Sequence, residues 1–427
     1  MKPLLIILSA LIFWSLGISW GWCYPLDGYP YTGILRLEGF RLAQEGKVRG
    51  IRLYSGALLP NNHVGLRLLD SPDFQIPEPR PEFTTKIKSL LGAEADRYGV
   101  AVLDMSDPEQ PLYTEHRGDA RANPGSVGKI IVVLAVFQAL ADIYPDDVQA
   151  RLEVLRNSMI TADEYIQSDH HKVPFWTAGS KKIWYRPIQV GDQASLWTYL
   201  DWMLSASSNA AASMVMRELV LMVKFGKAYP TSADVAHAFL TETPQQELAA
   251  LFSRALHDPV SRNGLDIKQL RQGSFFTRQG KRRIPGTTSY ASPRELLRYL
   301  IRLEQGKLVD PFSSREIKRL LYMTQGRIRY ASSPALGNAA VYFKSGSLYK
   351  CKAEPDFECR KYHGNVVNML NSVAVVESPA AEKKLFYMVA VMSNVLRKNS
   401  AMVHQTLATR LHQLIENYHK RRKSTSP

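Results

Sequence analysis

Two residues at the start of an apolar segment have types and spacing that could do chemistry. Ser126 and Lys129 lie three residues apart in NPGSVGKIIVVLAVFQAL. On a helix such a pair shares one face, with Cβ atoms about 5–6 Å apart. A serine hydroxyl becomes a nucleophile when a neighbouring group takes its proton, and a buried lysine with a lowered pKa can be that group. Alternatively, Ser126 simply caps the helix and Lys129 is solvated.

Two more segments place hydroxyl, amide and amine groups at the edge of an apolar helix or strand. They are Ser207-Ser208-Asn209 and Lys344-Ser345-Gly346-Ser347. Serine and asparagine are also common helix caps, and a lysine on an edge strand can serve only to discourage aggregation. Taken singly, each segment therefore has a purely structural interpretation.

In their order along the chain, the three segments resemble the Ser-x-x-Lys, Ser-x-Asn and Lys-Ser-Gly motifs of the penicillin-recognising serine hydrolases. These include the class A β-lactamases and the D,D-peptidases. The similarity covers roughly residues 82–420, and residues 286–321 resemble the Thr-Thr-x-x-x-Pro helix region of class A enzymes. The resemblance implies a β-lactamase/transpeptidase-like fold and an acyl-enzyme mechanism, with no cofactor and no metal.

The resemblance also assigns catalytic roles by position. Ser126 is expected to be the acylated nucleophile, with Lys129 as its base or proton relay. Ser207 is expected to pass a proton to the leaving nitrogen. Asn209 is expected to hold the substrate amide and Lys129.

The last motif is expected to bind substrate. Lys344 would supply positive potential for a substrate carboxylate, and Ser345 would hydrogen-bond it. Gly346 permits a close backbone approach. The backbone N–H groups of Ser126 and Ser347 would form an oxyanion hole, which stabilises the charge of the tetrahedral intermediate.

One part of the class A pattern is missing. Class A enzymes carry a glutamate before the Thr-Thr segment that activates the water for deacylation, but residues 267–294 contain no Asp or Glu. Ser208 also replaces the aspartate that is usual between the Ser and Asn of class A enzymes. The nearest carboxylates lie outside the stretch, at Asp266, Glu295, Glu242 and Glu247. A carboxylate general base cannot come from a stretch without carboxylates, so we expect acylation without fast deacylation of β-lactams.

Three functions follow from this pattern. The first is a serine hydrolase that cleaves an amide in a cell-wall peptide or a related β-lactam-like substrate. The second is a divergent class A-like β-lactamase with a relocated deacylation base. The third, of another class, is a wall-binding pseudoenzyme that uses the cleft as a receptor.

Hydrophobic patterning indicates an α+β fold. We expect a helix at 82–97, a mostly helical stretch from about 145 to 325 and a closing amphipathic helix at 401–420. The expected strands are 98–105, 111–117, 338–350, 370–378 and 384–394. Two strands at the start and three at the end predict one antiparallel five-stranded sheet from both termini, with an inserted helical subdomain.

The remaining segments are expected to flank this hydrolase domain (82–420). Residues 1–22 are expected to form a signal peptide or membrane anchor. Short alternating runs predict a small β-rich segment at 24–71, followed by a Pro-rich linker at 72–81 and a basic tail at 421–427. Lipidation of Cys23 is disfavoured, because Trp22 precedes it where a small residue is expected.

The net charge and the cysteine pair limit which partners and which cellular compartment are expected. The net charge of +15 favours anionic surroundings, but export makes nucleic acid an unexpected partner. A periplasmic or extracytoplasmic location, with membrane association through the N-terminus as an alternative, allows Cys351 and Cys359 to form a disulfide. The cluster Glu164, Asp169, His170 and His171 is interpreted as a solvated or substrate-lining loop, with a metal site as the weaker alternative.

Overall fold

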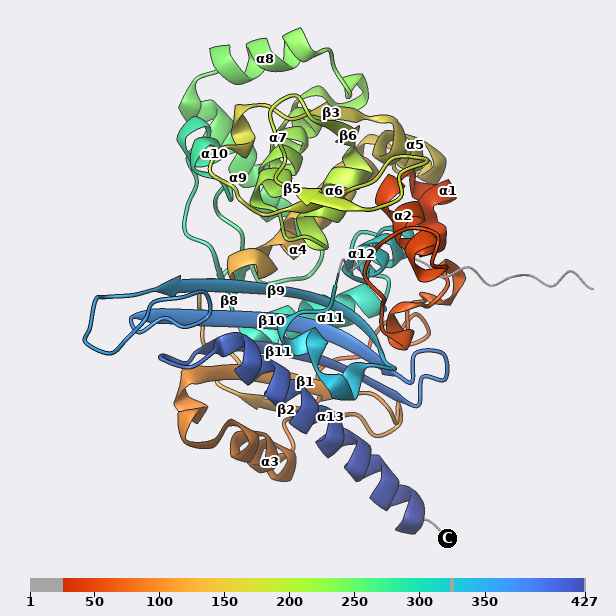
Figure 1. Ribbon diagram of the computed structural model, residues 1–427, viewed down its shortest axis with the longest axis vertical. Helices are drawn as coiled ribbons and strands as arrows, with labels where there is room; N and C mark the ends of the chain where they lie inside the picture. The colour runs from red at the N-terminus through yellow and green to blue at the C-terminus, as the bar shows by residue number, and fades with distance from the viewer. Residues whose placement is uncertain (1–25, 323–325, 426–427) are drawn as a thin grey trace, which may run out of the picture.

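A five-stranded antiparallel sheet assembles from both ends of the chain, as the sequence predicts (Figure 1). The computed structural model describes residues 26–322 and 326–425. The strand order is β2-β1-β11-β10-β9, which leaves β9 at one edge. The bounds are β1 Tyr98–Asp104, β2 Leu112–His116, β9 Ala340–Lys350, β10 Val367–Ser378 and β11 Leu385–Asn394. The expected α+β fold class is confirmed.

Helices cover both faces of the sheet because its strands are apolar on both sides. In β1, Val100 and Val102 face a core shared with α3 (Pro81–Leu91) and α13 (Ser400–Thr425). The alternating residues Ala101 and Leu103 belong to a second, larger core under the helical region. Figure 1 shows α3 and α13 on one side of the sheet and the helical region on the other.

The helical region is inserted between β2 and β9, as predicted. Its helices are α4 Lys129–Ile143, α5 Val148–Asn157, α6 Leu196–Leu204, α7 Asn209–Phe225, α8 Ala233–Glu242, α9 Gln245–Arg262, α10 Arg278–Arg283, α11 Pro293–Glu304 and α12 Pro311–Tyr322. Three small sheets accompany them: β3 Met159–Thr161 with β6 Gln193–Ser195, β4 Val173–Phe175 with β5 Trp184–Arg186, and β7 Leu270–Arg271 with β8 Tyr290–Ala291.

Helix α4 runs through the centre of the larger core. Within the part of the chain that the structure describes, the helical run 125–143 is long and apolar enough to cross a membrane. However, 83% of its apolar window is buried inside the protein. Its hydrophobicity is therefore that of a core helix, and it anchors the residues at its N-terminus rigidly.

The predicted β-rich segment at 24–71 is wrong. The region forms α1 (Tyr29–Thr32), α2 (Leu35–Gln44) and short 3₁₀ turns at Leu26–Gly28, Ser55–Ala57 and Asn61–His63. The alternating run at 33–37 enters α2, where Leu37 and Phe40 are buried at helical spacing. So short an apolar run fits the period of a helix as well as that of a strand. Tertiary contacts therefore determine which of the two forms.

The N-terminal segment packs onto the hydrolase domain along its length. Arg36 makes a buried ion pair with Asp201 in α6. Farther along, the backbone N–H of Leu59 donates to the Tyr322 hydroxyl, and that of Leu68 donates to the carbonyl of Glu304. These contacts use the backbone groups that a sheet would have paired.

The proline-rich residues and the basic C-terminus also pack against the domain. Gln305 Nε2 donates to the carbonyls of Pro72 and Phe74, so the extended segment before α3 is held against α11. The expected tail at 421–427 is wrong in its start, since α13 continues to Thr425. Arg422 pairs with Asp107, which fixes this last part of the helix near the start of β2.

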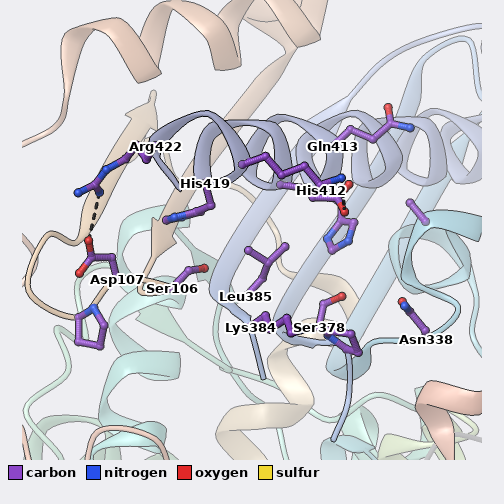
Figure 2. A pocket seen from close by; sticks show the side chains of 15 residues that line it. Ser106, Asp107, Asn338, Ser378, Lys384, Leu385, His412, Gln413, His419 and Arg422 are labelled. Atoms are coloured by element: carbon purple, nitrogen blue, oxygen red, sulfur yellow. Dashed lines mark ion pairs between the residues drawn. The ribbon is translucent and has the colours of Figure 1, made fainter. Parts of the chain in front are cut away.

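A cavity of about 990 Å³ lies between α13 and the loops at one end of the sheet (Figure 2). Charged groups at its wall are paired within the protein. His419 bonds to the buried Asp104, and the Arg422–Asp107 pair closes one end (Figure 2). The cavity contains none of the motif residues predicted from the sequence.

Candidate active site

The three motifs meet where the inserted helices join the sheet edge. Ser126 lies in the 3₁₀ turn η5 (Gly125–Gly128), and Lys129 is the first residue of α4. Lys129 is fully buried, with its Nζ 3.3 Å from the Ser126 Oγ. The same Nζ donates to the carbonyl of Ser207 at 2.7 Å and to Asn209 Oδ1 at 2.8 Å. The first two motifs are thus joined through one amine.

This geometry fits a neutral lysine that acts as a base. A neutral amine has two N–H donors and one lone pair, because it is the ammonium of a charged lysine less one proton. The oxygens of Ser207 and Asn209 occupy two donors. The lone pair then remains for its third neighbour, the hydroxyl of Ser126. Removal of the Ser126 proton needs no rearrangement of the lysine.

The third motif joins the same cluster. Lys344 Nζ, on β9, donates to the Ser207 Oγ at 2.8 Å. Ser207 has a φ of +58°, a left-handed conformation that is unfavourable for a residue with a side chain. Such strain concentrates at functional sites, where surrounding contacts hold it. The bonds from Lys129 and Lys344 to this one residue are such contacts.

The pKa values of Lys129 and Lys344 are both lowered in this site. The pKa of Lys129 is lowered to about 7. Burial has the largest effect on this pKa, Asp169 opposes the lowering, and Arg329 adds to it. Burial also lowers the pKa of Lys344 well below its ordinary value, and the neighbouring Lys129 and Arg329 add to this effect. A bound anion would favour the charged form of Lys344. The site is therefore arranged to receive negative charge.

Gly346 brings β9 against the nucleophile's backbone. A Cβ atom placed on Gly346 would lie 2.5 Å from the backbone N of Ser126 and 2.9 Å from the carbonyl O of Pro124. Only glycine allows this approach. It brings the backbone around Ser347 next to that of Ser126, as the predicted oxyanion hole requires.

Replacement of Gly346 by alanine is expected to slow acylation by penicillin about 100-fold or more, a loss comparable to removal of one oxyanion-hole donor. The added methyl group must push β9 away from Ser126. Stopped-flow or gel-based acylation rates measure the effect. Gly65→Ala is the matched control, because its added Cβ meets nothing within 4 Å. An unchanged rate for Gly346→Ala would show that the close approach is irrelevant to acylation.

The sequence reasoning missed a second cation at the substrate side of the site. Arg329 lies in the 3₁₀ turn Arg329–Ser332 before β9. Its guanidinium donates to the hydroxyls of Ser345 at 2.9 Å and Ser347 at 3.1 Å, and to the hydroxyl of Tyr362 at 3.0 Å. No motif surrounds this arginine in the sequence, so only the fold reveals it.

The loop that supplies Tyr362 is closed by a disulfide. Cys351 and Cys359 are bonded in the connection between β9 and β10. Tyr362 follows this loop, and its carbonyl accepts the backbone N–H of Ser400 at the start of α13. The disulfide loop is therefore tied to Arg329 and through it to the third motif.

An aromatic ring lies beside Lys129. The centroid of the Phe276 ring is 4.8 Å from Lys129 Nζ. Phe276 belongs to the stretch without acids. The flanking Glu295 instead binds the backbone N–H of Asp266 and the guanidinium of Arg298, and Glu242 and Glu247 are exposed on α8 and α9. The Glu295 carboxylate is therefore engaged in other contacts, and that of Asp266 accepts the backbone N–H of Lys268.

The histidine-rich loop serves the site through one residue. Asp169 Oδ2 accepts hydrogen bonds from the Ser208 hydroxyl and the Ala210 N–H. Glu164, in contrast, pairs with Arg283. Across the described residues, 26–322 and 326–425, no group of three or more His, Cys, Asp or Glu side chains could hold a metal ion.

The fold and the grouping of motifs are those of the penicillin-recognising serine hydrolase family. The chain belongs to the β-lactamase enzyme family, whose sequence profile matches residues 82–415.

Solved structures agree with this fold at low sequence identity. PBP-A is 14% identical with a TM-score of 0.51, over 80% of this chain and all of that one. A mutant of PBP-A, solved as an acyl-enzyme complex with penicillin G, is 13% identical (TM-score 0.50; 81% and 100% covered). A β-lactamase from Chitinophaga pinensis is 15% identical (TM-score 0.50; 78% and 98% covered). No curated protein sequence matches the chain.

Proposed function

We propose that this protein is an exported active-site-serine hydrolase that forms an acyl-enzyme on Ser126 with a cell-wall peptide and releases β-lactams slowly. The observation that carries the proposal is the buried Lys129 amine, whose Nζ lies 3.3 Å from the Ser126 Oγ while it donates to the Ser207 carbonyl and to Asn209 Oδ1. The disulfide and the apolar N-terminal residues support export, since disulfides persist in oxidising compartments.

The proposed reaction proceeds in two half-reactions. In the first, Ser126 Oγ attacks the amide carbonyl as Lys129 takes its proton, and the N–H groups of Ser126 and Ser347 stabilise the oxyanion. The C–N bond then breaks, and the leaving nitrogen gains a proton through Ser207, which Lys344 contacts. In the second, a water or an acceptor amine attacks the ester and releases Ser126.

The substrate is proposed to carry a carboxylate beside the scissile amide. The groups that would bind this carboxylate lie close together. Arg329 donates to the hydroxyls of Ser345 and Ser347, and Lys344 Nζ donates to the carbonyl of Ser345. A guanidinium held at a fixed angle suits a carboxylate, which it can bind through two parallel hydrogen bonds.

Replacement of Arg329 by alanine is expected to reduce the second-order acylation rate about 10- to 100-fold, the effect of a lost charge-assisted hydrogen bond. Comparison of penicillin with its methyl ester tests whether the loss comes from the contact of Arg329 with the substrate carboxylate. The loss should occur with the free acid and largely vanish with the ester. An equal loss with both would assign Arg329 a structural role instead.

Incubation with purified cell-wall peptides tests the function itself. Wild-type protein is expected to release the terminal residue, detected by liquid chromatography and mass spectrometry, and Ser126→Ala is expected to release none. Efficient turnover of penicillin without peptide cleavage would instead identify a β-lactamase with its base elsewhere. Peptide binding without any cleavage or acylation would identify a receptor.

A further inference from the structure

Asp169 lies in the loop between the turn Glu164–Ile166 and β4. Its side chain is only 3% exposed. Oδ2 accepts from Ser208 Oγ at 2.9 Å and from the Ala210 N–H at 2.8 Å. Oδ1 accepts from the ring Nδ1 of His171 at 2.6 Å. These hydrogen bonds of the carboxylate go either to the start of α7 or to a neighbour in its own loop.

The contacts of Asp169 complete the cap of α7. Ser208 is the N-cap residue, and its Oγ accepts the Ala211 N–H at 3.1 Å. Asp169 takes the next free N–H, that of Ala210. A carboxylate is favourable at a helix N-terminus because the helix dipole is positive there. The first turn of α7 carries Asn209 and follows the strained Ser207, so this cap fixes both residues.

Asp169 also supplies negative charge to a cationic site. Lys129 is faced by the hydroxyl of Ser126, the oxygens of Ser207 and Asn209, and the ring of Phe276. The charges that act on it are Asp169, which favours its ammonium form, and Arg329, which opposes it. Lys344 and Lys129 also repel each other. Among these groups Asp169 is the single acid.

We infer that Asp169 is a positioning residue of the acylation reaction, which holds the Ser207–Asn209 turn from a separate loop and provides the counter-charge for Lys129. The inference rests on the proposed acyl-enzyme function. The turn itself has Ser208 at the position that carries aspartate in class A sequences. Here the carboxylate comes instead from a loop residue 39 positions earlier and reaches the same helix start.

The pH profile of acylation separates this role from a merely structural one. Asp169→Asn and Asp169→Ser remove the charge but retain a hydrogen-bond acceptor for α7. Without the carboxylate, the ammonium form of Lys129 is less favoured, so neutral Lys129 appears at lower pH. Both variants should shift the acid limb of the acylation rate to lower pH and reduce the plateau rate several-fold. Asp147→Asn is the matched control, because Asp147 caps the remote helix α5.

The readout is the rate of Ser126 labelling by a fluorescent penicillin between pH 5 and 9, with thermal unfolding measured on each variant. A lower plateau with an unmoved acid limb in a folded variant would overturn the counter-charge role, and wild-type kinetics would overturn the inference entirely. Two variants are used so that a folding failure of one does not decide the result. If wild-type protein is not labelled at any pH, the proposed function fails instead.

Discussion

Acylation of Ser126 by penicillin is expected to rise about tenfold per pH unit on the acid side and to level off above about pH 7. Burial lowers the pKa of Lys129 to about 7, and only the neutral amine can accept the serine proton. Below that pKa the neutral fraction falls tenfold with each unit of pH. Substrate binding adds a negative charge, which raises the pKa of Lys129. The acid limb of the acylation rate measured for the bound complex is therefore expected at higher pH.

Lys129→Arg is expected to slow acylation about 100- to 10,000-fold, the usual contribution of general base catalysis. A guanidinium keeps the positive charge but cannot lose a proton in a protein. Lys350→Arg is the matched control, since Lys350 lies at the end of β9 with an exposed side chain. The assignment of Lys129 as base would be wrong if Lys129→Arg retained both the rate and the pH profile.

The second large effect is expected from Phe276→Glu. This change places a carboxylate next to Lys129, where the Phe276 ring now lies 4.8 Å from Nζ. A carboxylate at that point can bind a water and take its proton as the water attacks the ester. The lifetime of the penicillin acyl-enzyme should then shorten about 100-fold or more, while acylation persists.

The isosteric control is Phe276→Gln, which has a similar shape to glutamate but no basic group. It should leave the acyl-enzyme long-lived. The added charge of glutamate should also raise the pKa of Lys129, so acylation by Phe276→Glu should require a higher pH. If both variants released the adduct at the same faster rate, wider access of water rather than a general base would explain the release.

Much of the site could be predicted because short motifs fix local chemistry. Ser126 and Lys129 lie one helical turn apart, so their proximity follows from the helix itself. The order of strands in sequence also indicated a sheet built from both termini. Gly346 could be assigned its close approach because few other roles require glycine between a lysine-serine pair and a serine on a strand.

The residues that were missed depend on contacts between distant segments. Arg329 and Tyr362 are 33 positions apart, and neither lies in a motif. In the sequence Asp169 belongs to a histidine-rich loop, and its partner Ser208 is 39 positions away. The N-terminal segment was assigned strands because its apolar runs are short, while its helices and docked turns are set by packing on α6, α11 and α12.

The most direct test of the central claim is the intact mass of the purified soluble protein, wild type and Ser126→Ala, followed over time with penicillin. The account predicts a covalent adduct on the wild type only, mapped to Ser126 and persistent after free drug is removed. Rapid hydrolysis of penicillin with no lasting adduct would contradict the slow deacylation inferred from the absence of Asp and Glu in residues 267–294. An adduct that also formed on Ser126→Ala would contradict the assignment of the nucleophile.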